Sequence, residues 1–236
     1  MINIGNYFHN AGIDLTDIQI EQLNRYYELL TAKNKVMNLT AITEYDEVVI
    51  KHFCDSAAII HAIDLKDIVS VIDVGTGAGF PGMVLKIIFP WLNVTLLDSL
   101  NKRIGFLNEV IHDLALSDIK AIHGRAEDYA HNEEYREKFD LCVSRAVANL
   151  ASLSEYCIPF VKENGLFVSY KASDCDEEVS KARKAIATLG GNISENKSYI
   201  LPETEIERKF IIVEKSQKTS KKYPRKAGTP TKEPIL

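Results

Sequence analysis

The stretch Val71-Ile72-Asp73-Val74-Gly75-Thr76-Gly77-Ala78-Gly79-Phe80-Pro81-Gly82 decides the fold. A short apolar run stops at a glycine cluster, which predicts a buried strand followed by a sharp turn whose backbone can approach a ligand closely. The third glycine follows the first by four residues, whereas the dinucleotide fingerprint G-x-G-x-x-G places it five residues on. The tighter loop leaves less room for a pyrophosphate and favours a cofactor without one, such as S-adenosylmethionine. The alternative is a purely structural turn.

The acid Asp98 supports a ligand at this turn. It ends a second apolar run, Val94–Leu97, nineteen residues after Gly79, where a carboxylate accepts hydrogen bonds from ribose hydroxyls. An aspartate at a strand end can instead cap the next helix, but Ser99 is available for that role. We therefore expect Ser99 to cap the helix and Asp98 to bind the ribose of the cofactor.

Two further predicted strands end in polar residues. Arg125-Ala126-Glu127-Asp128 follows the third strand, where a backbone N–H and a carboxylate can recognise an adenine edge or simply begin a helix. Arg145 lies at the end of the fourth strand, beside the glycine loop, and a surface salt bridge is its alternative role. The carboxyl ends of parallel strands meet at one edge of a sheet. This convergence predicts the cofactor site of a class I methyltransferase.

The chain from residue 68 alternates strands and helices. The predicted strands are Val69–Val74, Val94–Leu97, Ala121–Ile122, Phe139–Val143, Leu166–Tyr170 and Arg208–Glu214, and the predicted helices are 82–89, 102–114, 150–161 and 177–189. Such alternation predicts an α/β fold, a mostly parallel sheet with helices on both faces. Tyr199-Ile200-Leu201-Pro202 precedes the last strand without an intervening helix, so we expect an antiparallel hairpin at one edge. The predicted fold is the Rossmann-like, class I S-adenosylmethionine-dependent methyltransferase fold with seven strands.

Two helices precede the sheet. Thr16-Asp17-Ile18-Gln19 has the form of a capping box, and a second helix is predicted from Glu44 to about Ala62. In that helix His52 and Asp55 lie three residues apart, on the flank of an apolar stripe, where they can reach substrate or bond each other. We therefore predict an N-terminal helical cap (1–66), a methyltransferase core (67–214) and a basic C-terminal tail (215–236) packed on or near the core.

Composition places the chain among ordinary globular proteins. Of its 236 residues 46% are hydrophobic and 26% charged, and no apolar run approaches the roughly 20 residues that span a bilayer. The N-terminus lacks a secretory pattern, so we expect a cytoplasmic protein without membrane contact. The four cysteines are widely spaced, which disfavours a disulfide framework, and with the histidine pattern leads us to expect no metal. Cys142 is expected to be a small buried hydrophobe.

The charge is unevenly distributed. Residues 214–236 hold seven cations against Glu214 and Glu233, a net charge of +5, so the remainder of this −5 chain carries −10. A basic strip on an acidic body indicates a local contact with a polyanion, and a solvated terminal charge run is the alternative. Pro224, Gly228 and Pro230 predict a turned path rather than a free arm.

The fourth strand end, Cys142-Val143-Ser144-Arg145-Ala146, narrows the chemistry. It lacks the Asn or Asp, two prolines and aromatic residue of exocyclic-amine methyltransferases, and the sequence has no Pro-Cys pair for attack on a pyrimidine. Both of those chemistries are therefore disfavoured.

Together the motifs resemble a known family. Its marks here are Asn38-Leu39-Thr40, His52 with Asp55-Ser56, Asp73–Gly82, Leu97-Asp98-Ser99, Gly124–Glu127, Ser144-Arg145-Ala146 and Tyr223–Pro230. They resemble the bacterial small-subunit ribosomal RNA guanine-N7 methyltransferase G family, also called glucose-inhibited division protein B. The resemblance spans nearly the whole chain.

This resemblance implies methyl transfer from S-adenosylmethionine to one loop guanine of 16S rRNA, in naked RNA or in the small ribosomal subunit. It implies cofactor contacts by Gly75, Phe80, Ala126, Glu127 and Arg145. The residue patterns add Gly77 and Asp98 as cofactor contacts, and the candidate contacts to substrate are His52, Asp55, Lys171, Lys222, Arg225 and Lys226.

No general base is assigned, because guanine N7 already presents a lone pair; Arg145 is a candidate for positioning. We expect a monomer. The alternatives are an S-adenosylmethionine-binding ribosome assembly factor without turnover and a small NAD-dependent dehydrogenase, against which the glycine spacing and the lack of a Tyr-x-x-x-Lys relay argue. Replacing Lys221, Lys222, Arg225 and Lys226 by Ala is expected to weaken RNA binding and leave cofactor affinity intact.

Overall fold

The computed structural model describes residues 2–145 and 148–236 of the chain, so Ala146, the last residue of the Ser-Arg-Ala strand end, lies outside the described residues. The strands are β1 (Ser70–Val74), β2 (Asn93–Asp98), β3 (Ile119–His123), β4 (Phe139–Arg145), β5 (Val161–Ala172), β6 (Gly191–Ile200) and β7 (Glu207–Lys215). They form one seven-stranded sheet in the order β3-β2-β1-β4-β5-β7-β6. β1 to β5 run parallel, and β7 is antiparallel to both β5 and β6.

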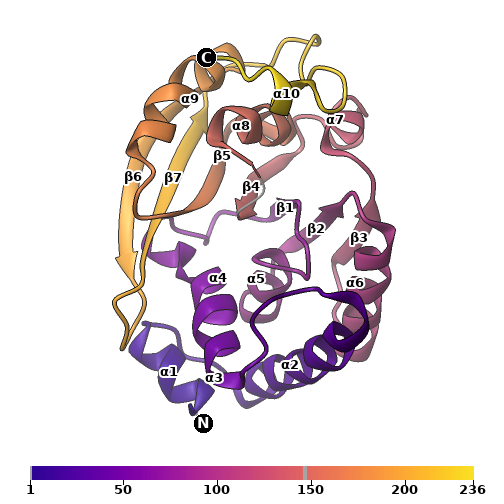
Figure 1. Cartoon of the computed structure of the whole chain (residues 1–236), viewed down its shortest axis with the longest axis vertical. Helices are drawn as coiled ribbons and strands as arrows, with labels where there is room; N and C mark the ends of the chain where they lie inside the picture. The colour runs from indigo at the N-terminus through magenta and orange to yellow at the C-terminus, as the bar shows by residue number, and fades with distance from the viewer. Residues whose placement is uncertain (1, 146–147) are drawn as a thin grey trace.

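Helices cover both faces of this sheet. They are α1 (Ile4–Asn10), α2 (Asp17–Met37), α3 (Tyr45–Val48), α4 (Asp55–Ala57), α5 (Gly82–Ile88), α6 (Asn101–Asp113), α7 (Ala126–Tyr129), α8 (Leu150–Cys157), α9 (Asp176–Thr188) and α10 (Thr229–Lys232). A π-helical turn, Val49–Cys54, joins α3 to α4. Figure 1 shows α1 to α6 on one side of the sheet and α7 to α10 on the other.

The alternation of side chains along each strand divides the interior into two cores. Val71 and Val143 face the core shared with α1 to α6. Ile72 and Cys142 face the core shared with α7 to α9. Both faces are apolar because helices cover both, which is the usual state of a parallel sheet. Each fully buried Val or Leu side chain stabilises the fold by about 1.5–3 kcal/mol relative to an exposed one.

Strand order places the ligand crevice. The chain passes from β1 outward to β2 and β3, then returns to the other side of β1 as β4. The connections that follow β1 and β4 therefore diverge, and the crevice between them is where open α/β sheets bind ligands. The glycine loop follows β1, and Arg145 is the last residue of β4.

The structure confirms the predicted fold class, including the antiparallel hairpin of β6 and β7. It also confirms the capping box: the Thr16 side chain accepts from the Gln19 N–H, and the Gln19 side chain accepts from the Thr16 N–H. Two elements, α1 and α10, were not predicted. The strand before the last turn begins at Gly191, well before Tyr199, and was missed because residues 194–198 are all polar and show no apolar alternation.

Candidate functional site

The loop after β1 is held open by backbone geometry and by one buried acid. Gly75 and Gly77 have φ of 73° and 63°, and they form the sharp turn that the sequence predicted. The Oδ2 atom of Asp73 accepts from the Thr76 hydroxyl at 2.6 Å and from the Gly82 N–H at 2.8 Å, so one carboxylate ties together both ends of the loop. Burial raises the pKa of Asp73 to about 6. From α2, the Tyr26 hydroxyl donates to the Ala78 carbonyl.

Gly77 faces open space. A Cβ built on it meets no atom within 4 Å, although its φ is in the region that L side chains rarely adopt. Its N–H donates to Oδ2 of Asp98 at 2.9 Å. The loop thus presents bare backbone toward the crevice, which is the arrangement that a closely bound ligand requires.

Asp98 anchors more groups than the sequence predicted. The helix α6 begins after Leu100, whose N–H donates to Oδ1 of Asp98 at 2.9 Å, and Arg103 Nη1 donates to Oδ2 at 3.1 Å. The expectation that Ser99 caps this helix is wrong: no side chain caps α6 at its N-cap residue, and Asp98 itself accepts the hydrogen bond. The carboxylate is only 2% exposed. Asp98 therefore links the glycine loop to the start of α6.

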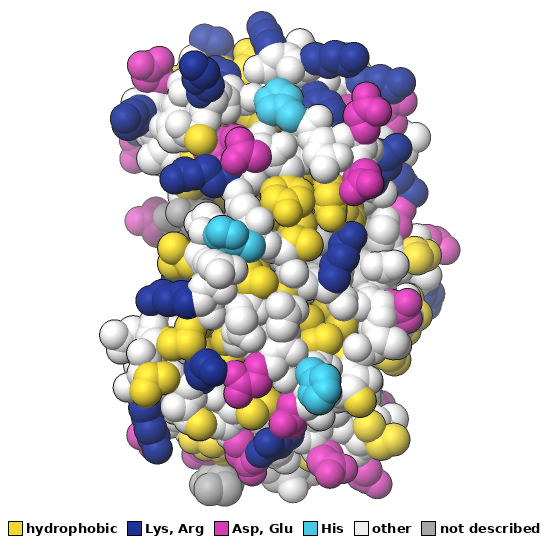
Figure 2. Space-filling model, turned by 90° about the vertical axis from the view of Figure 1, so that its right-hand side faces the viewer, with side chains coloured by type: hydrophobic (Ala, Val, Ile, Leu, Met, Phe, Trp, Pro, Cys, Tyr) yellow, Lys and Arg dark blue, Asp and Glu magenta, His cyan; other side chains and the backbone are white. Residues whose placement is uncertain are grey.

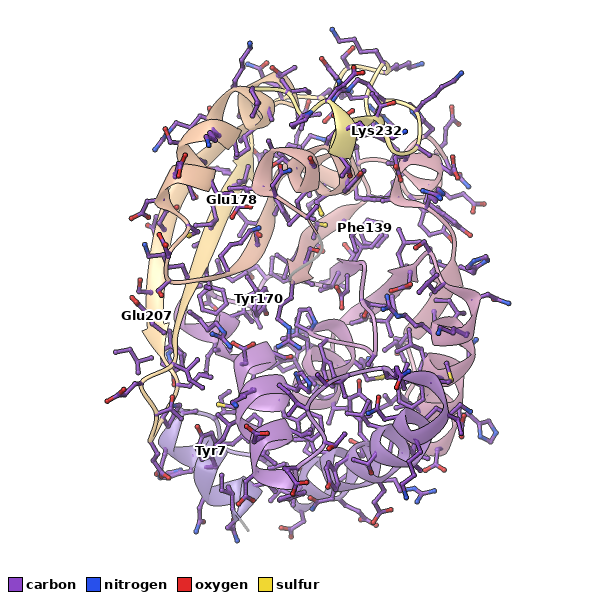
Figure 3. The ribbon with its side chains drawn as sticks, viewed as in Figure 1. Tyr7, Phe139, Tyr170, Glu178, Glu207 and Lys232 are labelled. Carbon is purple, nitrogen blue, oxygen red and sulfur yellow. The ribbon has the colours of Figure 1, made fainter. Side chains whose placement is uncertain are left out.

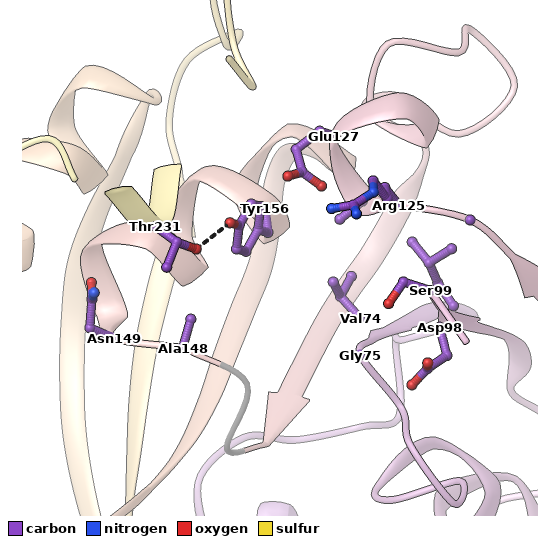
Figure 4. A pocket seen from close by; sticks show the side chains of 13 residues that line it. Val74, Gly75, Asp98, Ser99, Arg125, Glu127, Ala148, Asn149, Tyr156 and Thr231 are labelled. Atoms are coloured by element: carbon purple, nitrogen blue, oxygen red, sulfur yellow. Dashed lines mark hydrogen bonds between the residues drawn. The ribbon is translucent and has the colours of Figure 1, made fainter. Parts of the chain in front are cut away.

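A first cavity of about 310 Å³ opens beside these strand ends (Figure 4). We call it the adenine-side cavity, after the adenine contact that the sequence predicts for Ala126 and Glu127. Gly75, Asp98, Ala126 and Glu127 line it together, so three of the four predicted strand ends meet here, whereas Arg145 lines the adjoining second cavity. Its apolar walls include Val74, Leu97 and Ala148. Tyr156 and Thr231, which the sequence analysis missed, complete the wall, and their hydroxyls are hydrogen-bonded at 2.7 Å (Figure 4).

A second cavity of about 370 Å³, the loop-side cavity, shares Gly75, Asp98 and Ser99 with the first. Gly77, Phe80, His52 and Arg145 also line it. The His52 ring stacks on Phe80 with centroids 4.5 Å apart, and the Arg145 guanidinium lies over the same Phe80 ring at 5.3 Å. Burial and the nearby Arg145 charge lower the pKa of His52 to about 4, so its ring is uncharged at neutral pH.

Asp55 joins two arginines from different strands. Its Oδ2 accepts from Arg145 Nη1 at 2.6 Å, and its Oδ1 accepts from Arg208 Nε at 2.7 Å. His52 and Asp55 do not bond each other, but both contact Arg145, since His52 Nδ1 lies 3.5 Å from Arg145 Nη2. The π-helical turn helps to bring these residues to one side, because the Asp55 N–H reaches back five residues to the Ile50 carbonyl.

The C-terminal segment, defined here as residues 216–236, packs on α7 and α8. The Gly228 N–H donates to Glu127 Oε1 at 3.0 Å, and the Ser152 hydroxyl donates to the Pro230 carbonyl at 2.6 Å. Arg225 Nη2 donates to the buried Glu155 at 2.7 Å, and Arg225 Nε contacts the same carboxylate. The prediction of a fixed, turned path is confirmed.

Two of the seven predicted tail cations serve the interior. Lys215 is 1% exposed and pairs with Glu137 at 2.8 Å, and Arg225 pairs with Glu155. The remaining five are exposed on the surface: Lys218, Lys221, Lys222, Lys226 and Lys232. Figure 2 shows Lys and Arg side chains gathered at the upper end of the molecule, where the C-terminal segment lies in Figure 1. Fewer tail cations are therefore exposed at the surface than the charge count of the sequence indicated.

Lys171 lies one residue before the end of β5. Its Nζ donates to Glu178 Oε1 at 2.7 Å and to the Ala148 carbonyl at 3.0 Å. It lines a third cavity with His52, Asp55 and Arg145, so four strand-end or cap residues from the sequence prediction meet there. Arg208 lines the same cavity and was missed, although an antiparallel strand begins at the edge where parallel strands end.

The cysteines take no part in these cavities. All four are free and buried, and burial raises the pKa of Cys142 well above its usual value, so this thiol is a small buried hydrophobe as predicted. Within residues 2–145 and 148–236, no group of three or more His, Cys, Asp or Glu side chains is placed to hold a metal ion. No helix in the described part of the chain has the length and apolarity that a bilayer crossing demands.

The fold, with its glycine loop after β1, is that of the class I methyltransferases. Solved structures of this class resemble the chain in fold. The ribosomal protein L11 methylase of Lactobacillus delbrueckii subsp. bulgaricus has a TM-score of 0.52 and 15% identity, covering 71% of this chain and 79% of that one. Precorrin-6y C5,15-methyltransferase of Geobacter metallireducens has a TM-score of 0.51 and 14% identity, covering 68% and 86%.

Sequence comparison defines the family within that class. The model of the GidB family, described as rRNA small subunit methyltransferase G, matches residues 19–207. A protein named ribosomal RNA small subunit methyltransferase G from Lachnoclostridium phytofermentans is 52% identical over 96% of this chain and 94% of its own length. The protein of that name from Bacillus pumilus is 50% identical over 95% and 94%. The chain belongs to the GidB family.

Proposed function

We propose that the protein transfers a methyl group from S-adenosylmethionine to N7 of one loop guanine in 16S ribosomal RNA. One observation carries the proposal: at the β1/β4 crevice two adjoining cavities are lined by the glycine loop, Asp98, Glu127 and Arg145. The family supports the same activity, because relatives about half identical over most of their length are named small-subunit rRNA methyltransferases.

The residues present fit S-adenosylmethionine. Gly77 offers open space at a positive φ, as an extended ligand lying against the loop requires. The adenine-side cavity combines apolar walls with Glu127, whose Oε1 accepts from Gly228 and whose Oε2 accepts no hydrogen bond from the described residues. An adenine ring needs those apolar walls and an acceptor for its exocyclic amine. We assign Ala126 and Glu127 to the base, Asp98 to the ribose, and Gly75, Gly77, Phe80 and Arg145 to the remainder of the cofactor.

When bound, S-adenosylmethionine supplies a methyl group on a positively charged sulfonium. The chain itself needs no general base, because guanine N7 has a free lone pair. His52 is uncharged at neutral pH and therefore does not repel a sulfonium. Arg145 is fixed by Asp55 and lies against Phe80, so it defines the wall between the two reactants. Positioning for in-line transfer, together with electrostatics as charge moves off sulfur, supplies the rate enhancement under this mechanism.

The three parts of the chain have separate roles in this proposal. Residues 67–214 form the catalytic core, and residues 1–66 form a cap that brings His52 and Asp55 to the acceptor side. Residues 215–236 present exposed lysines, Lys222 and Lys226 among them, to RNA phosphates. Arg225 is held by Glu155 and serves to fix the tail. A loop guanine suits this site because an unpaired base can be splayed out and stacked. We expect a monomer acting in the cytoplasm.

The decisive test is incubation of the protein with methyl-labelled S-adenosylmethionine and 30S subunits that lack the modification. We expect label on a single guanine of 16S rRNA at N7, mapped by nuclease digestion and mass spectrometry. Deproteinised 16S rRNA in a parallel reaction defines the substrate. Cofactor binding with tight 30S association but no label would instead identify an assembly factor without turnover.

A further inference from the structure

A third cavity, of about 340 Å³, adjoins the loop-side cavity and shares His52 and Arg145 with it. Its walls include Lys51, Asp55, Tyr170, Lys171 and Arg208. Tyr170 lies in the interior, and its hydroxyl donates to the Ser56 carbonyl at 2.8 Å, which joins β5 to α4 (Figure 3). We call this space the acceptor-side cavity. Its size is within the range of small-ligand pockets.

Positive charge dominates this cavity. Four cationic side chains line it, and Asp55 is the only carboxylate among its described lining residues. Lys51 pairs with Glu47, and Lys171 pairs with Glu178, so each of these lysines has its own partner. Arg145 and Arg208 must share Asp55, which is 2% exposed. The floor of the cavity therefore carries one uncompensated positive charge at a site partly shielded from water.

Arg208 is the cation with donors to spare. Its Nε donates to Asp55 and its Nη1 to the Glu207 carbonyl at 3.3 Å, whereas its Nη2 donates to no residue that the structure describes. The side chain is 24% exposed, so a ligand can reach it. A guanidinium held on one side presents a fixed pair of N–H groups on the other, and this fork matches phosphate oxygens.

The fold places Arg208 at the correct edge. β7 is antiparallel to β5, and Arg208 pairs with Ala172 at the carboxyl end of β5. The amino end of β7 thus lies at the edge where β4 delivers Arg145. The two arginines face the same cavity from different strands, and Asp55 of the cap fixes both of them.

We infer that Arg208 binds the RNA phosphate that flanks the target nucleoside, in the acceptor-side cavity. The inference rests on the proposed function, which makes an RNA nucleotide the acceptor. Each nucleotide brings a single charge to the site, and the floor has a single surplus charge to meet it. The anchored phosphate sets the depth at which the base enters beside His52 and Arg145.

The test compares Arg208→Gln, Arg208→Lys and a matched surface control, Arg183→Gln, whose arginine lies exposed on α9. Equilibrium binding to 30S subunits is measured over a range of salt concentrations. We expect Arg208→Gln to weaken binding at least fivefold and to reduce the slope of log affinity against log salt by about 0.7, the value for one phosphate of single-stranded RNA. Arg208→Lys keeps the charge and restores the slope, and Arg183→Gln behaves as the parent.

Two controls separate the inference from simpler explanations. Calorimetric titration with S-adenosylmethionine should give the parent's affinity for all three variants, and thermal unfolding reports any loss of the Asp55 pair. A parent-like salt slope in Arg208→Gln overturns the inference, even if the variant is less stable. Binding by the parent without methyl transfer overturns the proposed function and leaves the measurement on Arg208 intact.

Discussion

The loop Gly75–Gly79 and the C-terminal segment border the same adenine-side cavity although they are far apart in the sequence. The loop contributes bare backbone with positive φ, and its two ends are tied by a contact between residues nine positions apart, Asp73 and Gly82, with further support from Asp98 and Tyr26. The C-terminal segment contributes side chains, and its shape comes from partners such as Glu155, seventy residues away from Arg225. The comparison teaches that local turn chemistry and distant ion pairs build one site together.

The largest expected effect lies in the loop. Replacing Gly77 by Val forces a β-branched residue into φ of +63° and projects its side chain into the crevice. We expect at least a hundredfold loss of S-adenosylmethionine affinity in calorimetric titration, with the fold retained by circular dichroism. The control is Gly105→Val on α6, where a Cβ also meets no atom within 4 Å. Parent-like affinity in a folded Gly77 variant would contradict the loop's role.

The next largest effect is expected in the C-terminal segment. Arg225→Ala removes the partner of Glu155, a carboxylate that is 1% exposed. Leaving a buried charge unpaired costs several kcal/mol, and partial exposure of the arginine reduces the expected loss of unfolding free energy to about 2–3 kcal/mol. Urea denaturation measures it, with the exposed Lys226→Ala as the control. Equal stabilities of the two variants would show that the ion pair does not hold the segment.

A pH effect follows from His52, which stacks on the loop residue Phe80. Because its folded pKa of about 4 lies below the ordinary 6.5, the unfolded state binds the proton first as pH falls. His52 therefore destabilises the fold progressively from pH 6.5 down to pH 4, by on the order of 2 kcal/mol at pH 5. Asp73, whose pKa is raised to about 6, acts in the opposite direction.

His52→Asn isolates this contribution. We expect the variant to lose about 2 kcal/mol less unfolding free energy than the parent between pH 7 and pH 5. Urea denaturation at the two pH values measures the difference. Identical losses in the two proteins would mean that the ring is not buried in its neutral form.

Asp98→Ala tests whether Asp98 contributes to cofactor binding as well as to the structure of the loop. The change removes the acceptor of the Gly77 N–H and the proposed ribose partner together. A hydrogen bond to a charged group is worth about 1.5–3 kcal/mol, so we expect at least tenfold weaker S-adenosylmethionine binding. Calorimetric titration decides the matter, and an unchanged dissociation constant would reduce Asp98 to an anchor for α6.

The smallest effect concerns the exposed lysines. A triple change of Lys221, Lys222 and Lys226 to Ala leaves Arg225 in place, which the fourfold change proposed from the sequence does not. We expect unchanged cofactor affinity and a 30S-binding salt slope reduced by about 0.7 for each phosphate released. Lys35, Lys66 and Lys138, exposed elsewhere, provide the matched triple control. Equal slopes in the two triples would make the tail a solubilising terminus.

Prediction from the sequence succeeded where the determinants are local. The strand–glycine–helix pattern around Gly75 to Gly82 predicted the buried strand, the sharp turn and the helix that follows, because each depends largely on neighbouring residues. The position of Asp98 at the end of a strand was predicted correctly, but its hydrogen bond from the Leu100 N–H was not. Ser99 and Asp98 are equally plausible caps for the next helix until the backbone is known.

The remaining errors come from charges whose partners are remote. Counting cations along the sequence assumes that each one is solvated. Lys215 pairs with Glu137, and Arg225 with Glu155, only after β7 and α8 are packed. Arg208 was not predicted as a site residue for the same reason. Its place in the cavity depends on the pairing of β7 with β5 and on its ion pair with Asp55 of the cap. No spacing pattern in the sequence predicts these ion pairs between remote residues.

Thr231 lines the adenine-side cavity, and Gly228 donates a hydrogen bond to Glu127 in its wall, which has a consequence for biosynthesis. Chains emerge from the ribosome from the N-terminus onward, so the glycine loop and Asp98 are made long before residues 228–231. A nascent chain can complete most of its sheet and still lack one wall of this cavity. If this cavity holds the cofactor as we propose, full cofactor affinity is acquired only when residues 228–231 have been released and packed, later than the folding of the sheet.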